Sequence, residues 1–192
     1  MDDEADRERI RRGLMRFLAA NPVSSTSIDG VAAEANVTTS RFQSLYGTLG
    51  WAISDTFFQR YRPLQDESEA NLQSIGREPS QALRVEACLA DHFRKLGRLT
   101  TDDDNVHLVR ALVRAYGLST LGVEGQTSNV LVSVARFAQH SIDRLLSMDP
   151  IKYDRLLVKR LGEIWTLNVL ETCLNYPADQ VETAVQRLVA RI

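Results

Sequence analysis

Six side chains that form hydrogen bonds lie close together between residues 38 and 44. They are Thr38, Thr39, Ser40, Arg41, Gln43 and Ser44. Threonine, serine and glutamine both donate and accept hydrogen bonds, and arginine donates through a planar fork. Such side chains bind the phosphates and base edges of DNA, with arginine suited to guanine and glutamine to adenine or a phosphate. The segment therefore predicts non-covalent recognition.

No catalytic motif accompanies this segment. The sequence has no glycine-rich phosphate loop, no G-x-S-x-G or H-E-x-x-H pattern and no repeated carboxylate pair. We therefore expect a protein that is not an enzyme and uses no cofactor. The histidines and cysteines lack metal-ligand spacing, and buried free thiols are favoured over a disulfide or a redox role. For residues 102–104, three aspartates in a row, a solvated turn that caps a helix is favoured over a cation site.

Two short helices are expected to position the recognition residues. Thr26 can cap the first helix, and Asp29 is placed to complete a capping box. Apolar residues at positions i, i+3, i+4 and i+7 give this helix one buried face. They are Ile28, Val31, Ala32 and Ala35.

A tight turn leads into the second short helix. Asn36 stands where the chain must turn, and asparagine tolerates a left-handed backbone. Thr38 can cap the second helix, whose buried face carries Phe42 and Tyr46. Helix, turn and helix at this spacing is the unit in which the second helix enters the major groove of DNA.

Residues 26–53 resemble the N-terminal domain of TetR-family transcriptional regulators. The family pattern is roughly T-x-x-x-x-I-A-x-x-A-G-V-S, then three residues, then L-Y-x-H/Y-F-x-S-K-x-x-L. The positions that match in type are Thr26, Val31, Ala32, Ala35, Val37, Thr38, Phe42, Tyr46 and Thr48, with Asn36 at the turn glycine. The resemblance implies an all-α fold. A three-helix helix-turn-helix domain would span residues 1–48, and a helical bundle for ligand binding and dimerisation would span residues 49–192.

The same resemblance implies a function. A regulator of this kind, expected to be a repressor, would bind a palindromic operator in double-stranded DNA as a homodimer. Thr26 and Ser27 would hold phosphates at a helix N-terminus, and Arg7 and Arg11 of the first helix would contact the DNA backbone. For the first-helix arginines, a solvated face paired with the neighbouring acidic residues is an equal alternative.

Three positions depart from the family pattern. Gln43 replaces a phosphate-contacting tyrosine, Leu45 replaces histidine or tyrosine, and Leu49 replaces a lysine that touches the DNA backbone. In addition, residues 26–46 hold a single basic residue, Arg41, against two acids. A second hypothesis is therefore a TetR-like fold that has lost DNA reading and serves as a ligand-binding or protein-interaction module. The two leucines would then form an apolar contact spot, or else simply extend the core.

The remainder of the chain is expected to be helical. Helices are predicted over about 5–20, 80–96, 103–116, 127–147, 151–175 and 178–192. A further helix is predicted from residue 49, and Pro63 should either end it or kink it, in which case the polar residues 65–74 continue it. In the fifth helix, Leu83, Ala87, Leu89, Ala90, Phe93 and Leu96 are expected to face inward. The helix over 151–175 is too apolar for packing on one side only, so the last two helices need a second surface to cover them. The resemblance to TetR-family regulators implies that this surface is the same pair of helices in a second subunit, which would form the dimer interface.

The helices of the bundle could enclose a small apolar ligand, although residues of the candidate wall types are more often plain core. The candidate wall residues are Cys88, His92, Phe93, Val109, Val113, Tyr116, Phe137, His140 and Trp165.

Composition agrees with a globular helical protein. The 192 residues include 10 glycines and 5 prolines, carry a net charge of −2, and are 44% hydrophobic and 25% charged. We find no run of 18 apolar residues and no signal region behind the acidic N-terminus. A cytoplasmic protein without a membrane partner is therefore expected.

Overall fold

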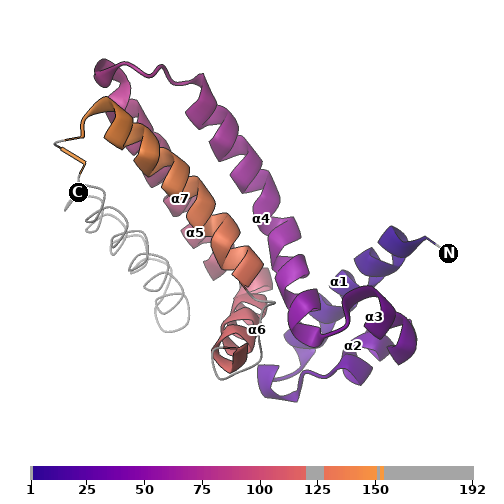
Figure 1. Ribbon diagram of the computed structural model, residues 1–192. Helices are drawn as coiled ribbons and strands as arrows, with labels where there is room; N and C mark the ends of the chain where they lie inside the picture. Colours follow the sequence, from indigo (N-terminus) through magenta and orange to yellow (C-terminus); the bar gives the residue numbers. More distant parts are fainter. Residues whose placement is uncertain (1, 120–127, 151, 154–192) are drawn as a thin grey trace. The chain divides into compact units, whose positions relative to one another are not determined.

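The computed structural model describes residues 2–119, 128–150 and 152–153, and within these every regular element is helical (Figure 1). This confirms the predicted all-α class. The predicted helices over 151–175 and 178–192, and with them the expected dimer interface, lie outside the described residues. The elements are α1 (Asp3–Ala20), η1 (Val23–Ser25), α2 (Ile28–Glu34), α3 (Thr39–Tyr46), α4 (Leu49–Ser74), η2 (Pro79–Gln81), α5 (Ala82–Thr101), α6 (Asp103–Ser119) and α7 (Ser128–Met148).

Pro63 lies inside α4, which continues to Ser74. Of the predicted alternatives, the helix therefore follows the one in which residues 65–74 continue it, while the inward face predicted for α5 is wrong in part. Proline lacks the backbone N–H that would donate one hydrogen bond of the helix. The backbone nevertheless remains helical on both sides of Pro63. In α5, Leu83 is 71% exposed and Ala87 is also exposed. The helix turns a neighbouring stripe inward, which includes Val85, His92 and Leu96.

The chain forms two compact units. Of the described residues, the first unit holds 2–59, 102–119 and 128–130, and the second holds 60–101, 131–150 and 152–153. The helix-turn-helix therefore packs with the start of α4 and with α6. The division into domains 1–48 and 49–192 stays a prediction.

The core of the first unit is apolar and closely packed around α1. A Cβ atom at Gly13 would lie 2.7 Å from the backbone of Ala35 at the end of α2. Because any side chain at residue 13 would meet backbone, glycine is required for α1 and α2 to approach this closely. The fully buried large side chains of this unit are Ile10, Leu14, Leu18, Val31, Phe42, Leu108 and Val109.

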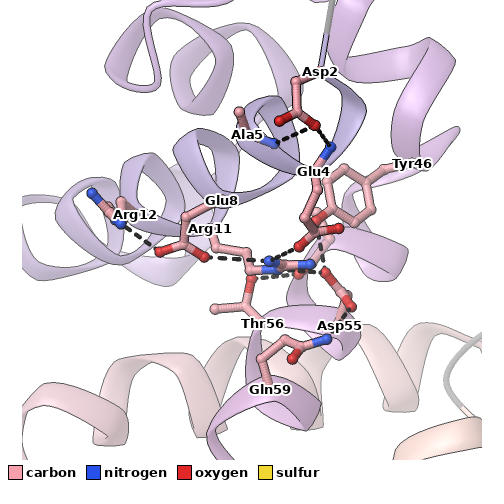
Figure 2. Close-up of polar contacts among 11 residues, drawn as sticks. Asp2, Glu4, Ala5, Glu8, Arg11, Arg12, Tyr46, Asp55, Thr56 and Gln59 are labelled. Atoms are coloured by element: carbon pink, nitrogen blue, oxygen red, sulfur yellow. Dashed lines mark hydrogen bonds and ion pairs between the residues drawn. The ribbon is translucent and has the colours of Figure 1, made fainter.

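A carboxylate joins three helices of this unit. Asp55 of α4 accepts hydrogen bonds from Arg11 Nε of α1 at 2.8 Å and from the Tyr46 hydroxyl of α3 at 2.7 Å (Figure 2). The side chains of Arg11 and Asp55 are 11% and 19% exposed. Burial acts to raise the pKa of Asp55, but the hydrogen bonds from Tyr46 and Arg11 hold it below its usual value. The ionised carboxylate therefore fixes α3 against α1 and α4.

A polar group also lies in the core of the second unit. His92 of α5 is fully buried; its Nδ1 lies 2.8 Å from the Ser68 hydroxyl and its Nε2 lies 3.2 Å from the Tyr61 hydroxyl, both on α4. Its ring centroid lies 4.1 Å from that of Phe137 on α7. Burial lowers the pKa of His92 to about 4. The imidazole is therefore neutral at pH 7, with both nitrogens hydrogen-bonded.

We predict that the Asp55 junction contributes measurably to stability. Asp55→Asn should lower the free energy of unfolding by about 1–3 kcal/mol, because the hydrogen bonds from Arg11 and Tyr46 lose their charged acceptor. Tyr46→Phe should cost about 1 kcal/mol. The matched control is Asp66→Asn on the same helix, since the Asp66 pair with Arg62 is exposed and long at 3.7 Å. Urea unfolding followed by circular dichroism tests this, and equal losses for Asp55→Asn and Asp66→Asn would contradict it.

We predict a loss of stability in acid that depends on His92. Below pH 6.5 an unfolded histidine takes up a proton, whereas folded His92 stays neutral until about pH 4. Stability should therefore fall between these pH values by up to about 3 kcal/mol. His92→Gln should flatten this part of the profile relative to the wild type, as measured by urea unfolding at stepped pH. His107→Gln controls for the removal of a histidine outside this network, and parallel wild-type and His92→Gln profiles would refute the prediction.

Candidate nucleic-acid interface

The N-terminus of α2 differs from the prediction by one residue. Ser27 caps the helix, since its Oγ accepts a hydrogen bond from the Gly30 N–H at 3.2 Å. Thr26, the predicted cap, ends the turn η1 and donates its hydroxyl to the Val23 carbonyl at 2.9 Å. Asp29 is consequently not part of a capping box. Its carboxylate accepts a 2.7 Å hydrogen bond from the Thr39 hydroxyl and so ties α2 to α3.

The turn and the second cap are as predicted. Asn36 has a left-handed φ of 55°, and the Val37 N–H after it donates to the Ala32 carbonyl at 3.0 Å. Thr38 caps α3, its hydroxyl accepting from the Arg41 N–H at 3.1 Å. These contacts, with Phe42 buried beneath α3, determine which side of α3 faces outward.

The outward side of α3 is polar. Leu45 is half-buried, so at this departure from the family pattern the side chain packs partly inside. The Ser44 hydroxyl donates to the Arg41 carbonyl at 2.8 Å, which leaves its lone pairs facing outward to accept. The exposed residues of this side, which we call the α3 face, are Thr38, Ser40, Gln43 and Ser44.

Arg41 points from α3 toward the beginning of α1. Its Nε donates to Asp6 Oδ2 at 2.6 Å, and an Nη donates to Asp3 Oδ1 at 2.6 Å. The side chain of Arg41 is 21% exposed. The hydrogen bond from Arg41 lowers the pKa of Asp6 and outweighs the opposite effect of burial. The one basic side chain of the helix-turn-helix is therefore already paired within the protein, which sequence patterns did not predict.

Several arginines of α1 have partners of their own. Arg7, a predicted phosphate contact, lies over the Tyr46 ring at 5.0 Å from its centroid. Arg11, the other, donates to Glu4 and Glu8 as well as to Asp55 (Figure 2). Arg12 pairs with Glu8, and Arg16 with Glu34. For Arg11, Arg12 and Arg16 the structure shows the paired arrangement, and phosphate binding by Arg7 and Arg11 stays a prediction.

Of the predicted ligand residues, the structure brings His92, Phe93 and Phe137 together in the second unit. The ring centroid of Phe93 lies 5.6 Å and that of Phe137 lies 4.1 Å from the centroid of His92. Val109 is buried in the first unit. The side chains of Val113 and Tyr116, and the whole of Trp165, lie outside the described residues. Two partners of His92 were missed, Tyr61 and Ser68. The two residues are seven apart in sequence, which puts them on one face of α4. This spacing was the one sequence feature that could have predicted both contacts with His92.

A groove of about 290 Å³ lies between α4 and α5 in the second unit. Ser68, Asn71, Arg84, Cys88 and Asp91 contribute to its lining, whereas His92, Phe93 and Phe137 do not. Burial raises the pKa of the Cys88 thiol, so the thiol is protonated at pH 7. Ile75 and Ala87 add apolar surface to this lining, and Cys88 is one of the predicted wall residues. Binding of a small apolar ligand in the bundle stays a prediction.

Among the described residues, no three histidine, cysteine or carboxylate side chains gather in a way that could hold a metal ion. In the same part of the chain, no helix combines the length and the apolar character needed to cross a membrane.

Comparison with known proteins identifies the fold. No family model and no curated sequence matches the chain. A TetR-family transcriptional regulator from Mesorhizobium loti superposes with a TM-score of 0.56 at 15% identity, over 100% of this chain and 96% of that chain. A TetR regulator from a Rhodococcus species gives 0.55 at 15% identity, over 100% and 97%. The TetR-family repressor AlkX of a Dietzia species, implicated in the biodegradation of n-alkanes, gives 0.54 at 14% identity, over 96% and 94%.

These similarities extend over nearly the whole of each chain, and they agree with the caps, turn residue and buried faces described above. The chain therefore has the fold of TetR-family transcriptional regulators, as the resemblance of residues 26–53 implied.

Proposed function

We propose that this protein is a transcriptional regulator that binds double-stranded DNA through the α3 face. The observation that carries the proposal is the fixed polar side of α3: Thr38, Ser40, Gln43 and Ser44 are exposed, while capping, the Asp55 junction and buried Phe42 hold the helix in place. A helix with such a side can enter the major groove and form hydrogen bonds with base edges.

The rest of the proposal follows the fold. Ser27 exposes a hydroxyl at the start of α2, where a phosphate can bind. Thr26 directly precedes it in sequence, and Thr39 of α3 is tied to α2 by its hydrogen bond to Asp29. The regulator would be a homodimer joined through the last two helices, since two copies of α3 fit two half-sites of a palindrome. It would repress transcription until a small molecule in the second unit favours a spacing of the two α3 helices that does not fit the operator.

A second candidate function is a protein-interaction module of the same fold. The pairing of Arg41 with two carboxylates favours it, because little positive charge is left on α3 to attract phosphates. The half-buried state of Leu45 and Leu49 weighs against it, because neither leucine presents a large apolar contact spot.

Selection of bound sequences from a random duplex DNA pool distinguishes the two. Enrichment of a palindrome by the full chain supports the regulator. Absence of enrichment at low salt, with a protein that is folded by circular dichroism, would refute the proposed function and leave the interaction module.

We predict that Gln43→Ala weakens binding to the enriched duplex by about 1–3 kcal/mol, because an exposed amide on the α3 face loses its contact with a base or phosphate. The matched control is Gln73→Ala, an exposed glutamine near the end of α4, which should leave affinity unchanged. Fluorescence anisotropy at fixed salt measures both. Equal affinities of Gln43→Ala and the wild type would remove Gln43 from the interface.

A further inference from the structure

We propose that Asp6 and Asp3 act on Arg41 in opposite directions. Asp6 is a positioning residue that holds the guanidinium in place, and Asp3 occupies the donor group that an acceptor on DNA would otherwise take. The inference rests on the proposed DNA binding through α3.

Asp6 is suited to a fixed role. Its carboxylate is 4% exposed, and it accepts hydrogen bonds from Arg41 Nε at 2.6 Å and from Arg9. A buried carboxylate without its cationic partners is strongly unfavourable, so Asp6 keeps Arg41 close. Because it binds through Nε, it fixes the base of the guanidinium fork and leaves the outer nitrogens for another acceptor.

Asp3 is suited to a displaceable role. Its side chain is 71% exposed and accepts from an outer nitrogen of Arg41 at 2.6 Å. Exposed ion pairs contribute little to stability, so their loss costs little. The outer nitrogens of arginine are the groups that donate to guanine or to a phosphate. The Asp3 carboxylate therefore occupies the Arg41 nitrogen that would donate to a phosphate or base of DNA, and it competes with DNA for that hydrogen bond.

The sequence offers a matched control at the neighbouring position. Asp2 carries the same charge but caps α1 instead, accepting from the Glu4 and Ala5 N–H groups at 3.1 and 3.4 Å. Asparagine caps a helix as well as aspartate does. Asp2→Asn therefore removes one negative charge from the same end of α1 and leaves the cap and Arg41 as they are.

The test measures anisotropy of a labelled duplex from the random pool, or of an enriched sequence once one is found, with the full-length protein at low salt. Relative to Asp2→Asn, Asp3→Asn should bind DNA roughly 2–5-fold more tightly, the value of an exposed ion pair. Asp6→Asn should bind roughly 5-fold or more weakly, because the guanidinium of Arg41 is no longer fixed through its Nε and must be ordered when DNA binds. Equal affinities for Asp3→Asn and Asp2→Asn would overturn competition by Asp3.

A second background tests whether the effect of Asp3 acts through Arg41. In the Arg41→Ala protein, the difference between Asp3→Asn and Asp2→Asn should vanish, because the nitrogen that donates to Asp3 is gone. A difference that persists there would show a general charge effect and overturn the inference. Affinity of folded Asp6→Asn equal to or above that of Asp2→Asn would overturn the positioning role.

The binding data distinguish failure of the proposed DNA binding from failure of the competition by Asp3. If no variant binds the duplex pool at low salt although each is folded, DNA binding itself is refuted and this inference falls with it. If the wild type and Asp2→Asn bind and Asp3→Asn binds equally well, the proposed function stands and the competition is refuted.

Discussion

The carboxylate of Asp55 accepts hydrogen bonds from α1 and α3 while belonging to α4, and the placement of α3 depends on it. Apolar packing around Phe42 drives these helices together without specifying a direction. Hydrogen bonds to a half-buried carboxylate do have a direction, because they weaken steeply when bent. The junction therefore sets how α3 is rotated about its own axis, and this rotation decides which of its side chains face outward.

The arginines of α1 are used for cohesion within the first unit. Arg11 and Arg16 of α1 bind carboxylates of other helices. Arg41 of α3 in turn binds two carboxylates of α1. A protein that uses its cations internally has few left to displace counterions from DNA. In the proposed complex with DNA, recognition would rely mainly on hydrogen bonds from hydroxyl and amide groups together with Arg41, and the affinity would depend only weakly on salt.

Sequence patterns predicted the features that depend on near neighbours. The left-handed Asn36, the cap at Thr38 and the buried faces of α2 and α3 are all determined by residues within one or two turns. Thr26 and Ser27 are both good caps, so local sequence does not decide which of them begins α2. Ser27 is the cap because Thr26 already ends the preceding turn η1. The pairing of Arg41 with Asp6 spans 35 residues. With several arginines and acids on α1, local patterns do not specify which charges meet.

The close approach at Gly13 has a consequence for how the chain can vary. Because a Cβ there meets the backbone of Ala35 rather than a movable side chain, neighbouring side chains cannot repack to make room for it. Positions on the α3 face are open to solvent and can change without affecting the core. The first unit thus separates the positions that hold the scaffold together from those proposed to contact DNA. New binding preferences can be acquired there by substitution on one side of a single helix.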